Sequence, residues 1–202
     1  MIMDKLSVWL CNTSPRRWIL DFVTKKYYKE YFNVLRGKKV LEIGCGSGLG
    51  ARIILKYFVP SEIIATDLDE RQIVLAGNNV GDAHIIFEIA DAAQLNYPDH
   101  SFDAVFEYGA IHHIPSPDWQ KCLREILRVL KPNGKLFIYD VSIESFSKGV
   151  YGKLIRYTSK HPYDKMFRKE EFIDYIQSVG FRLLKRKDGG RYFTLVAEKQ
   201  CT

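Results

Sequence analysis

Glycines alternate in the segment VLEIGCGSGLG, and the first three of the four, Gly44, Gly46 and Gly48, come directly after an apolar run. The residues on either side predict a buried strand before the glycines and a helix after them. At the first turn of a doubly wound sheet, glycine permits unusual φ angles and lets the backbone approach a ligand closely. The loop therefore predicts a site for a nucleotide-like cofactor.

Two aspartates follow the next two predicted strands and could hold an adenosine. Asp67 ends the segment EIIATD, where a carboxylate can accept hydrogen bonds from both ribose hydroxyls, although a strand-end or helix-capping role is also open to it. Asp91 follows HIIFEIA and is placed to accept a hydrogen bond from an adenine amino group. The loop and the acids indicate bound adenosine without distinguishing NAD from another ligand, because residues 46–51 also fit the dinucleotide pattern GxGxxA.

Two features of the sequence argue against a dinucleotide. Glu42 stands on the strand two residues before Gly44, where a phosphate would be repelled and an ammonium-bearing ligand tolerated. The Tyr-x-x-x-Lys pair of the short-chain dehydrogenases does not occur in the chain, and its length leaves no second domain for a hydride-transfer substrate.

The segments that must position these residues alternate between strand and helix, which predicts a parallel α/β sheet. The last two segments read instead as an antiparallel hairpin, and residues 141–163 are partly helical at most. The expected strands are 39–44, 62–67, 84–90, 103–108, 135–140, 181–187 and 191–199, and the expected helices are 14–36, 49–58, 69–78, 117–130 and 168–180.

The composition is that of an ordinary globular protein. The chain has 202 residues, of which 47% are hydrophobic and 27% charged, which suits one domain with a full core. No apolar run approaches the roughly 18 residues of a membrane span, and the N-terminus is a poor signal peptide. The four cysteines are Cys11, Cys45, Cys122 and Cys201. They form no CxxC pair, so they indicate neither a zinc site nor a disulfide framework, and a reducing cytoplasm fits best.

The positive charge is concentrated before the glycine loop. Residues 1–39 carry nine Lys/Arg and three acids, which accounts for the whole net charge of +6. This basic, aromatic segment could contact anionic lipid, an acidic substrate or nucleic acid, or it could be a solvated helix face.

Four segments in order carry a family resemblance: VLEIGCGSGLG, ATDLD, ADAAQLNYPDHSFDAVF and LREILRVLKPNGKLFI. They resemble the motifs of class I S-adenosylmethionine-dependent methyltransferases, in particular the small bacterial group with a methyltransferase type 11 domain that is akin to ubiquinone/menaquinone and phospholipid methyltransferases. The resemblance runs from about residue 38 to the C-terminus. It implies a Rossmann-like, doubly wound, seven-stranded, mostly parallel sheet with an antiparallel C-terminal strand and helices on both faces. The single domain 1–202 would comprise a basic aromatic helical segment (1–37), a cofactor-binding core (38–140), an acceptor-side insertion (141–165) and a C-terminal helix with hairpin (166–202).

The same resemblance implies S-adenosyl-L-methionine as cofactor, S-adenosyl-L-homocysteine as product, and no metal. Glu107, by its carboxylate or its carbonyl, could hold the methionine ammonium, and Tyr108 could face the sulfonium unless its ring packs under the following helix. The residues expected to bind the cofactor are Glu42, Gly44, Cys45, Gly46, Gly48, Asp67, Leu68, Asp91, Ala92 and Glu107.

The adjacent residues His112 and His113 suggest metal or base chemistry. Neighbouring residues on a helix point about 100° apart, and no third ligand stands at a suitable spacing, so a metal site is rejected. Tyr108, His112 and His113 form the expected catalytic set, with the histidines acting as base, as acceptor-orienting groups, or only structurally.

The expected function is transfer of a methyl group by in-line displacement to a small or lipid-like acceptor. The basic helix 16–35 could also touch a membrane surface from the cytoplasm, although packing over the cofactor explains it equally well. An NAD-dependent oxidoreductase and a non-catalytic S-adenosylmethionine-binding protein remain alternatives. A nucleic-acid substrate is disfavoured, because the body of the chain is neutral and EYGA replaces a DPPY-type tetrapeptide. The residues expected to line the acceptor site are Trp18, Tyr27, Tyr28, Tyr31, Tyr151, Tyr157 and His161.

Overall fold

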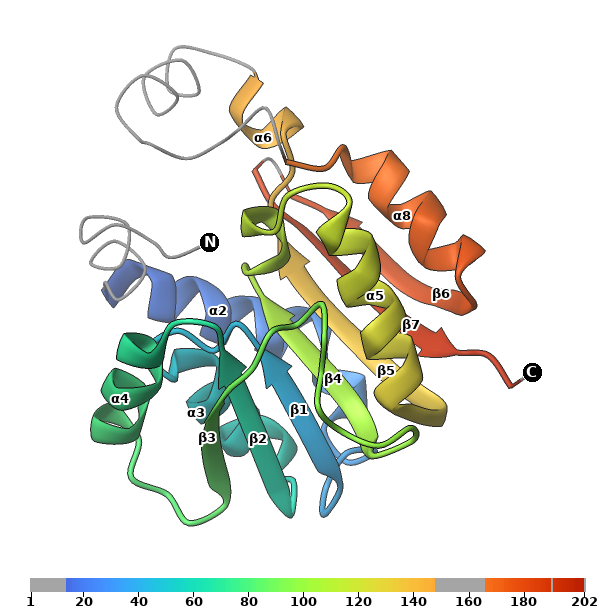
Figure 1. Cartoon of the computed structure of the whole chain (residues 1–202). Helices are drawn as coiled ribbons and strands as arrows, with labels where there is room; N and C mark the ends of the chain where they lie inside the picture. Colours follow the sequence, from blue (N-terminus) through green and yellow to red (C-terminus); the bar gives the residue numbers. More distant parts are fainter. Residues whose placement is uncertain (1–13, 148–165, 190, 202) are drawn as a thin grey trace.

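The structure is a computed structural model that describes residues 14–147, 166–189 and 191–201. Within them, seven strands form one sheet in the order β3-β2-β1-β4-β5-β7-β6 (Figure 1). β7 pairs antiparallel with both β5 and β6, whereas every other pairing is parallel. The expected sheet and its terminal hairpin are thus confirmed. The strands are β1 (Lys39–Ile43), β2 (Glu62–Asp67), β3 (Ile85–Ile89), β4 (Phe102–Tyr108), β5 (Leu130–Asp140), β6 (Phe181–Asp188) and β7 (Phe193–Lys199).

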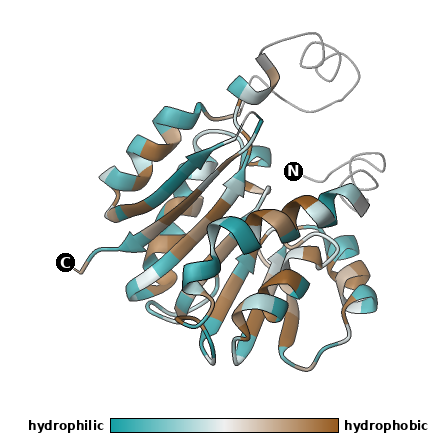
Figure 2. Ribbon diagram, turned by 180° about the vertical axis from the view of Figure 1, so that it is seen from behind, coloured by the Kyte–Doolittle hydropathy of each residue, from teal (hydrophilic) through white to brown (hydrophobic). Residues whose placement is uncertain are grey.

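Helices cover both faces of this sheet. α5 and α8 lie in front of it in Figure 1, and the view from behind in Figure 2 shows α2 and α3 across the other face. The α-helices are α2 (Ser14–Tyr27), α3 (Leu49–Phe58), α4 (Glu70–Asn79), α5 (Asp118–Val129), α6 (Glu144–Ser147) and α8 (Lys169–Ser178), and the 3₁₀ turns are η1 (Lys29–Tyr31) and η2 (Ile111–His113).

The core is two apolar layers separated by the sheet. On the α5 and α8 side, Trp119 and Phe172 are fully buried against strand residues such as Val105. On the α2 and α3 side, Phe58 packs edge-on against Phe106 at a centroid distance of 4.8 Å. Both faces are therefore anchored on β4, which fixes the strand ends that frame the candidate site.

The first helix is shorter than expected. Apolar spacing predicts a helix up to residue 36, but α2 ends at Tyr27 and η1 follows. Tyr28 turns inward, where its hydroxyl donates a hydrogen bond to the Ile138 carbonyl at 2.6 Å and its ring contacts Phe137. The tertiary contact with the sheet overrides the local helical pattern.

One of the connecting loops differs from the expected pattern. The KPNG turn lies inside β5, where the register shifts between the pairs Phe102–Leu130 and Ala104–Lys135 and Asn133 has φ of 61°. The connection from β3 to β4, residues 90–101, is a loop without a helix, as expected, and it packs on the α5 side of the sheet. Of the expected insertion, residues 141–147 are described and contain α6, while 148–165 lie outside the described residues.

Candidate functional site

A cavity of about 520 Å³ opens at the carboxyl ends of β1, β2 and β4. β1 lies between β2 and β4 in the sheet, so the strand order reverses there, which is where doubly wound sheets bind ligands. The volume falls in the range of small-molecule sites. The expected site residues that line it are Gly44, Gly46, Asp67, Leu68, Asp91, Ala92 and His113, whereas Glu42, Cys45, Gly48, Glu107, Tyr108 and His112 lie outside its wall.

Two glycines of the loop meet different demands. Gly44 has φ of +64°, and a Cβ atom on it would stand 2.2 Å from the Ala110 Cβ atom. Gly46 has φ of +51°, and a Cβ atom there would meet only the Gln72 side chain, at 3.9 Å. Gly44 therefore lets the ends of β1 and β4 meet, while Gly46 leaves the wall of the cavity as bare backbone.

Asp67 ties the end of β2 to the glycine loop. Its Oδ2 accepts a hydrogen bond from the Gly46 N–H at 2.9 Å, and its Oδ1 accepts one from the Asp69 N–H at 3.0 Å. Asp69 caps α4 by accepting from the Arg71 N–H at 3.0 Å. Because a carboxylate already occupies the Gly46 N–H, a pyrophosphate at this loop would face a negative charge instead of a free donor. The geometry disfavours a dinucleotide.

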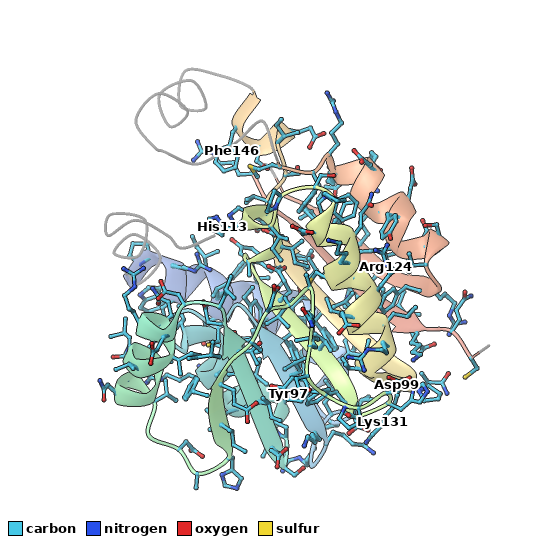
Figure 3. The ribbon with its side chains drawn as sticks, in the orientation of Figure 1. Tyr97, Asp99, His113, Arg124, Lys131 and Phe146 are labelled. Atoms are coloured by element: carbon cyan, nitrogen blue, oxygen red, sulfur yellow. The ribbon has the colours of Figure 1, made fainter. Side chains whose placement is uncertain are left out.

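The loop after β3 forms a second wall of the cavity. Asp91 accepts a hydrogen bond from the Ala93 N–H at 2.8 Å and forms an isolated bridge with Gln94. From α5, the Arg128 guanidinium donates to the Leu95 carbonyl at 2.8 Å and so holds this loop against the helix. Figure 3 shows Tyr97 and Asp99 in the same connection, below the carboxyl end of β4. The hydrogen bond from the Ala93 N–H and the contact of Arg128 with the Leu95 carbonyl thus hold the loop that carries Asp91 in place.

The wall of the cavity is acidic. It carries four aspartates against two basic residues, but Lys121 pairs with Asp118 at 2.7 Å and Asp69 pairs with Arg71 at 2.5 Å, which leaves Asp67 and Asp91 against one further basic residue. The remaining basic residue, Arg16 of α2, donates from Nη2 to the Tyr108 carbonyl at 2.7 Å. A ligand with a positively charged group is favoured over a polyphosphate. The aspartates are Asp67, Asp69, Asp91 and Asp118.

Two glutamates expected to touch the cofactor are buried beneath the loop. Glu42 is 1% exposed, and a Cβ atom on Gly50 would stand 1.8 Å from its Oε1. Glu107 is fully buried, and its Oε1 accepts hydrogen bonds from the Ala110 and Ile111 N–H groups. Burial raises the pKa of both carboxyls well above the ordinary value. Direct contact between these side chains and the cofactor stays a prediction.

Tyr108 and Cys45 also face the core of the sheet. The Tyr108 hydroxyl shares a hydrogen bond with Thr24 Oγ1 of α2 at 3.0 Å, and the side chain is 3% exposed. Cys45 is 5% exposed, and burial raises the pKa of its thiol. The ring of Tyr108 packs under a helix, which is the alternative that the sequence left open, although the helix is α2 and not the one that follows.

The two histidines of η2 take different positions. His113 lines the cavity and lies near the carboxyl end of β4 in Figure 3. His112 Nδ1 lies 2.5 Å from Asp140 Oδ1, and the His112 N–H donates to Asp140 Oδ2 at 3.0 Å. Asp140 is fully buried at the end of β5, and burial raises its pKa to about 7. The arrangement is a histidine oriented by a buried carboxylate. The part of the chain that the structure describes contains no cluster of His, Cys, Asp or Glu suited to a metal ion.

Two residues of this region were not expected from the sequence. Asp140 ends a strand at the same edge as Asp67 and Asp91, so the strand-end rule that selected those acids could have found it. Arg16 has no such signal, because its contact with Tyr108 joins residues 92 positions apart.

Of the expected acceptor-lining residues, the four that the structure describes, Trp18, Tyr27, Tyr28 and Tyr31, do not line the cavity. Trp18 is 77% exposed, while Tyr28 and Tyr31 are buried against the sheet. Tyr151, Tyr157 and His161 lie outside the described residues.

Comparison with known proteins agrees with this geometry. Residues 41–138 match the family model for a methyltransferase domain. The chain is 34% identical over 110 residues to 27-O-demethylrifamycin SV methyltransferase of Amycolatopsis mediterranei, covering 52% of this chain and 39% of the relative. It is 36% identical over 118 residues to sterol 24-C-methyltransferase erg6 of Aspergillus fumigatus, covering 56% of this chain and 30% of the relative. The chain thus spans about a third of the length of these curated relatives.

The fold has close counterparts among solved structures. A SAM-dependent methyltransferase from Aquifex aeolicus superposes with a TM-score of 0.76 at 22% identity, covering 98% of this chain and 100% of the other. This likeness concerns the fold, whereas the family model matches residues 41–138, which include the glycine loop, Asp67 and Asp91. Taken with the glycine loop and the strand-end acids, these matches show that residues 41–138 form a methyltransferase domain of the class I S-adenosylmethionine-dependent family.

Proposed function

We propose that the protein transfers a methyl group from S-adenosyl-L-methionine to a small or lipid-like acceptor. The observation that carries the proposal is the acidic cavity at the switch point, with Asp67 bonded to the Gly46 N–H. A sulfonium and an ammonium suit this cavity, and a pyrophosphate does not. The relatives above are named for a rifamycin and a sterol as substrates, which supports an acceptor of this class.

The residues present fit this cofactor from one end to the other. Asp91 and Ala92 would hold the adenine, and Asp67 would accept hydrogen bonds from the ribose hydroxyls. The bare backbone at Gly46 would accommodate the amino-acid portion. Arg16 lines the cavity at the end of β4, where it donates to the Tyr108 carbonyl, and its guanidinium would hold the carboxylate. When bound, the cofactor supplies an already activated methyl group, so alignment is the main task of the protein.

The His112–Asp140 pair would remove a proton from an acceptor that has to lose one. With the hydrogen of His112 on Nδ1, the Asp140 carboxylate would accept it, and Nε2 would be the nitrogen that takes the proton. Asp140 is a positioning residue in this scheme, because it acts through the imidazole. His113, on the wall of the cavity, would orient the acceptor.

Thermal denaturation with added ligand tests the proposal, since a ligand that binds only the folded state stabilises it by mass action. S-adenosyl-L-homocysteine should raise the Tm, and NAD at the same concentration should not. Formation of S-adenosyl-L-homocysteine with a panel of hydroxylated and lipid-like acceptors then tests turnover. Stabilisation by NAD alone would support an oxidoreductase. Stabilisation by S-adenosyl-L-homocysteine with no turnover on any acceptor would support a non-catalytic binding protein.

A further inference from the structure

The outward face of α2 is apolar where a solvated helix would be polar. Trp18 is 77% exposed and Phe22 is 53% exposed, one helical turn apart on the same face. The opposite face buries Leu20 and Val23 in the core. Ile19, 44% exposed, widens the apolar strip, and Figure 2 shows hydrophobic residues in the middle of this outer helix. Core packing of α2 therefore does not account for these aromatic side chains.

Basic residues extend the same face. Lys25 and Lys26 follow Trp18 by seven and eight positions, which places them on its side of the helix, and both are exposed. The Lys26 ammonium lies 5.1 Å from the centre of the Phe22 ring. The acid of this helix, Asp21, is paired with Lys56 at 2.7 Å, so it adds no free negative charge. The face combines bulky apolar side chains with an excess of positive charge.

We propose that this face of α2, defined by Trp18, Ile19, Phe22, Lys25 and Lys26, binds the surface of an anionic lipid bilayer. Aromatic residues and lysines side by side on one helix suit the headgroup region, where the rings enter the acyl boundary and the ammonium groups meet lipid phosphates. A protein partner is less well matched, because lysine is depleted at the centres of protein interfaces. The described residues contain no helix long and apolar enough to cross a bilayer.

The proposed membrane face lies on a different side of α2 from the cavity. Arg16, in the first turns of α2, lines the cavity, and Trp18 follows it by two residues. Because residues two positions apart on a helix point in nearly opposite directions, the face defined by Trp18 is turned away from Arg16. Binding to the bilayer is therefore independent of the proposed function.

Sedimentation of the full chain with phosphatidylglycerol/phosphatidylcholine vesicles tests the proposal. We expect binding at low salt, and strong weakening when the salt is raised to 1 M, because the Debye length falls to about 3 Å. Lys25→Gln/Lys26→Gln should lower the partition coefficient roughly 30-fold, the factor expected for two lysines near an anionic surface. Trp18→Ser/Phe22→Ser should lower it by about tenfold or more. Phosphatidylcholine vesicles alone should bind weakly.

A matched control lies on β6, where Leu184 and Lys187 are exposed. Leu184→Ser/Lys187→Gln removes one apolar and one basic side chain elsewhere on the surface and should leave vesicle binding unchanged. Quenching by brominated lipid reports on depth: in a Trp9→Phe background, Trp18 should be quenched, because Trp119 is fully buried. Absence of binding at low salt, equal loss in the control, or an unquenched Trp18 would overturn the proposal.

Two further measurements distinguish membrane binding from cofactor binding and from self-association of the chain. The Tm shift with S-adenosyl-L-homocysteine should be the same in all these variants, so loss of membrane binding and loss of cofactor binding are distinguishable. Sedimentation velocity without lipid should show one species for the wild type and for Trp18→Ser/Phe22→Ser. An oligomer that dissociates in the variant would overturn the membrane proposal in favour of a second copy of the chain on this face.

Discussion

Asp67→Ala is the sharpest test of the candidate site. In the structure its carboxylate accepts from the Gly46 and Asp69 N–H groups at 2.9 and 3.0 Å. The substitution removes both hydrogen bonds, and each contributes about 0.5–1.5 kcal/mol net, so the free energy of unfolding should fall by about 1–3 kcal/mol. The affected N–H groups lie beside the cavity, where water can reach them, so we expect the lower part of that range.

The substitution should weaken cofactor binding by more than it lowers the free energy of unfolding, and the two effects can be measured separately. A lost hydrogen bond to a charged group costs about 1.5–3 kcal/mol, so the Kd for S-adenosyl-L-homocysteine should rise roughly 10- to 100-fold. Titration calorimetry measures the Kd, and urea denaturation of the same preparations measures the stability.

Asp69→Ala is the matched control for this experiment. Asp69 also lines the cavity at the end of β2, but its carboxylate is committed to Arg71 and to the cap of α4. Loss of the cap should cost about 1 kcal/mol of stability. Its Kd should change less than threefold. If Asp69→Ala weakens binding and Asp67→Ala does not, the assignment of the ribose to Asp67 is wrong.

Three further changes probe other parts of the site. Gly44→Ala should lower the free energy of unfolding by about 2–4 kcal/mol in urea denaturation, from a strained positive φ and the clash with Ala110, and an unchanged stability would contradict the geometry of the loop. For an acceptor that must lose a proton, kcat should rise with pH and level off above about 7, because Asp140 has its pKa raised to about 7 and orients His112 only when ionised. Asp140→Asn should lower kcat by about 10²-fold or more and remove that inflection while the cofactor Kd stays the same; a retained inflection would contradict the pairing. Arg16→Gln should raise the Kd for S-adenosyl-L-homocysteine about tenfold or more but leave that for methylthioadenosine, which has no carboxylate, unchanged; equal losses for both would contradict the contact.

The local features of the fold follow closely from the sequence. The segments LGARIILKYF and EIIATD form α3 and β2 with the expected bounds, because a turn signal borders each apolar run. The end of α2 could not be predicted in this way. Its apolar spacing continues past Tyr27, and only the reach of Tyr28 to the Ile138 carbonyl, 110 positions away, ends the helix.

The residues of the candidate site also differ in how far the sequence alone could predict them. Asp67 and Asp91 stand at strand ends, so the carboxyl edge of a parallel sheet brings them to one cavity. The pairing of His112 with Asp140 depends on β4 and β5 being neighbours, which strand order decides. Glu42 illustrates the limit of spacing arguments: it stands two residues before the loop, but its side chain points beneath α3 and not into the cavity.

The contact between Glu42 and Gly50 constrains how the family can vary. A Cβ atom on residue 50 would fall 1.8 Å from the Glu42 Oε1 atom and 2.9 Å from the Tyr108 ring. An alanine at position 50 is therefore compatible with the fold only if position 42 shortens or turns away. In homologous chains the two positions should covary, and a single exchange at either one, grafted into this background, should be tolerated less well than the paired exchange.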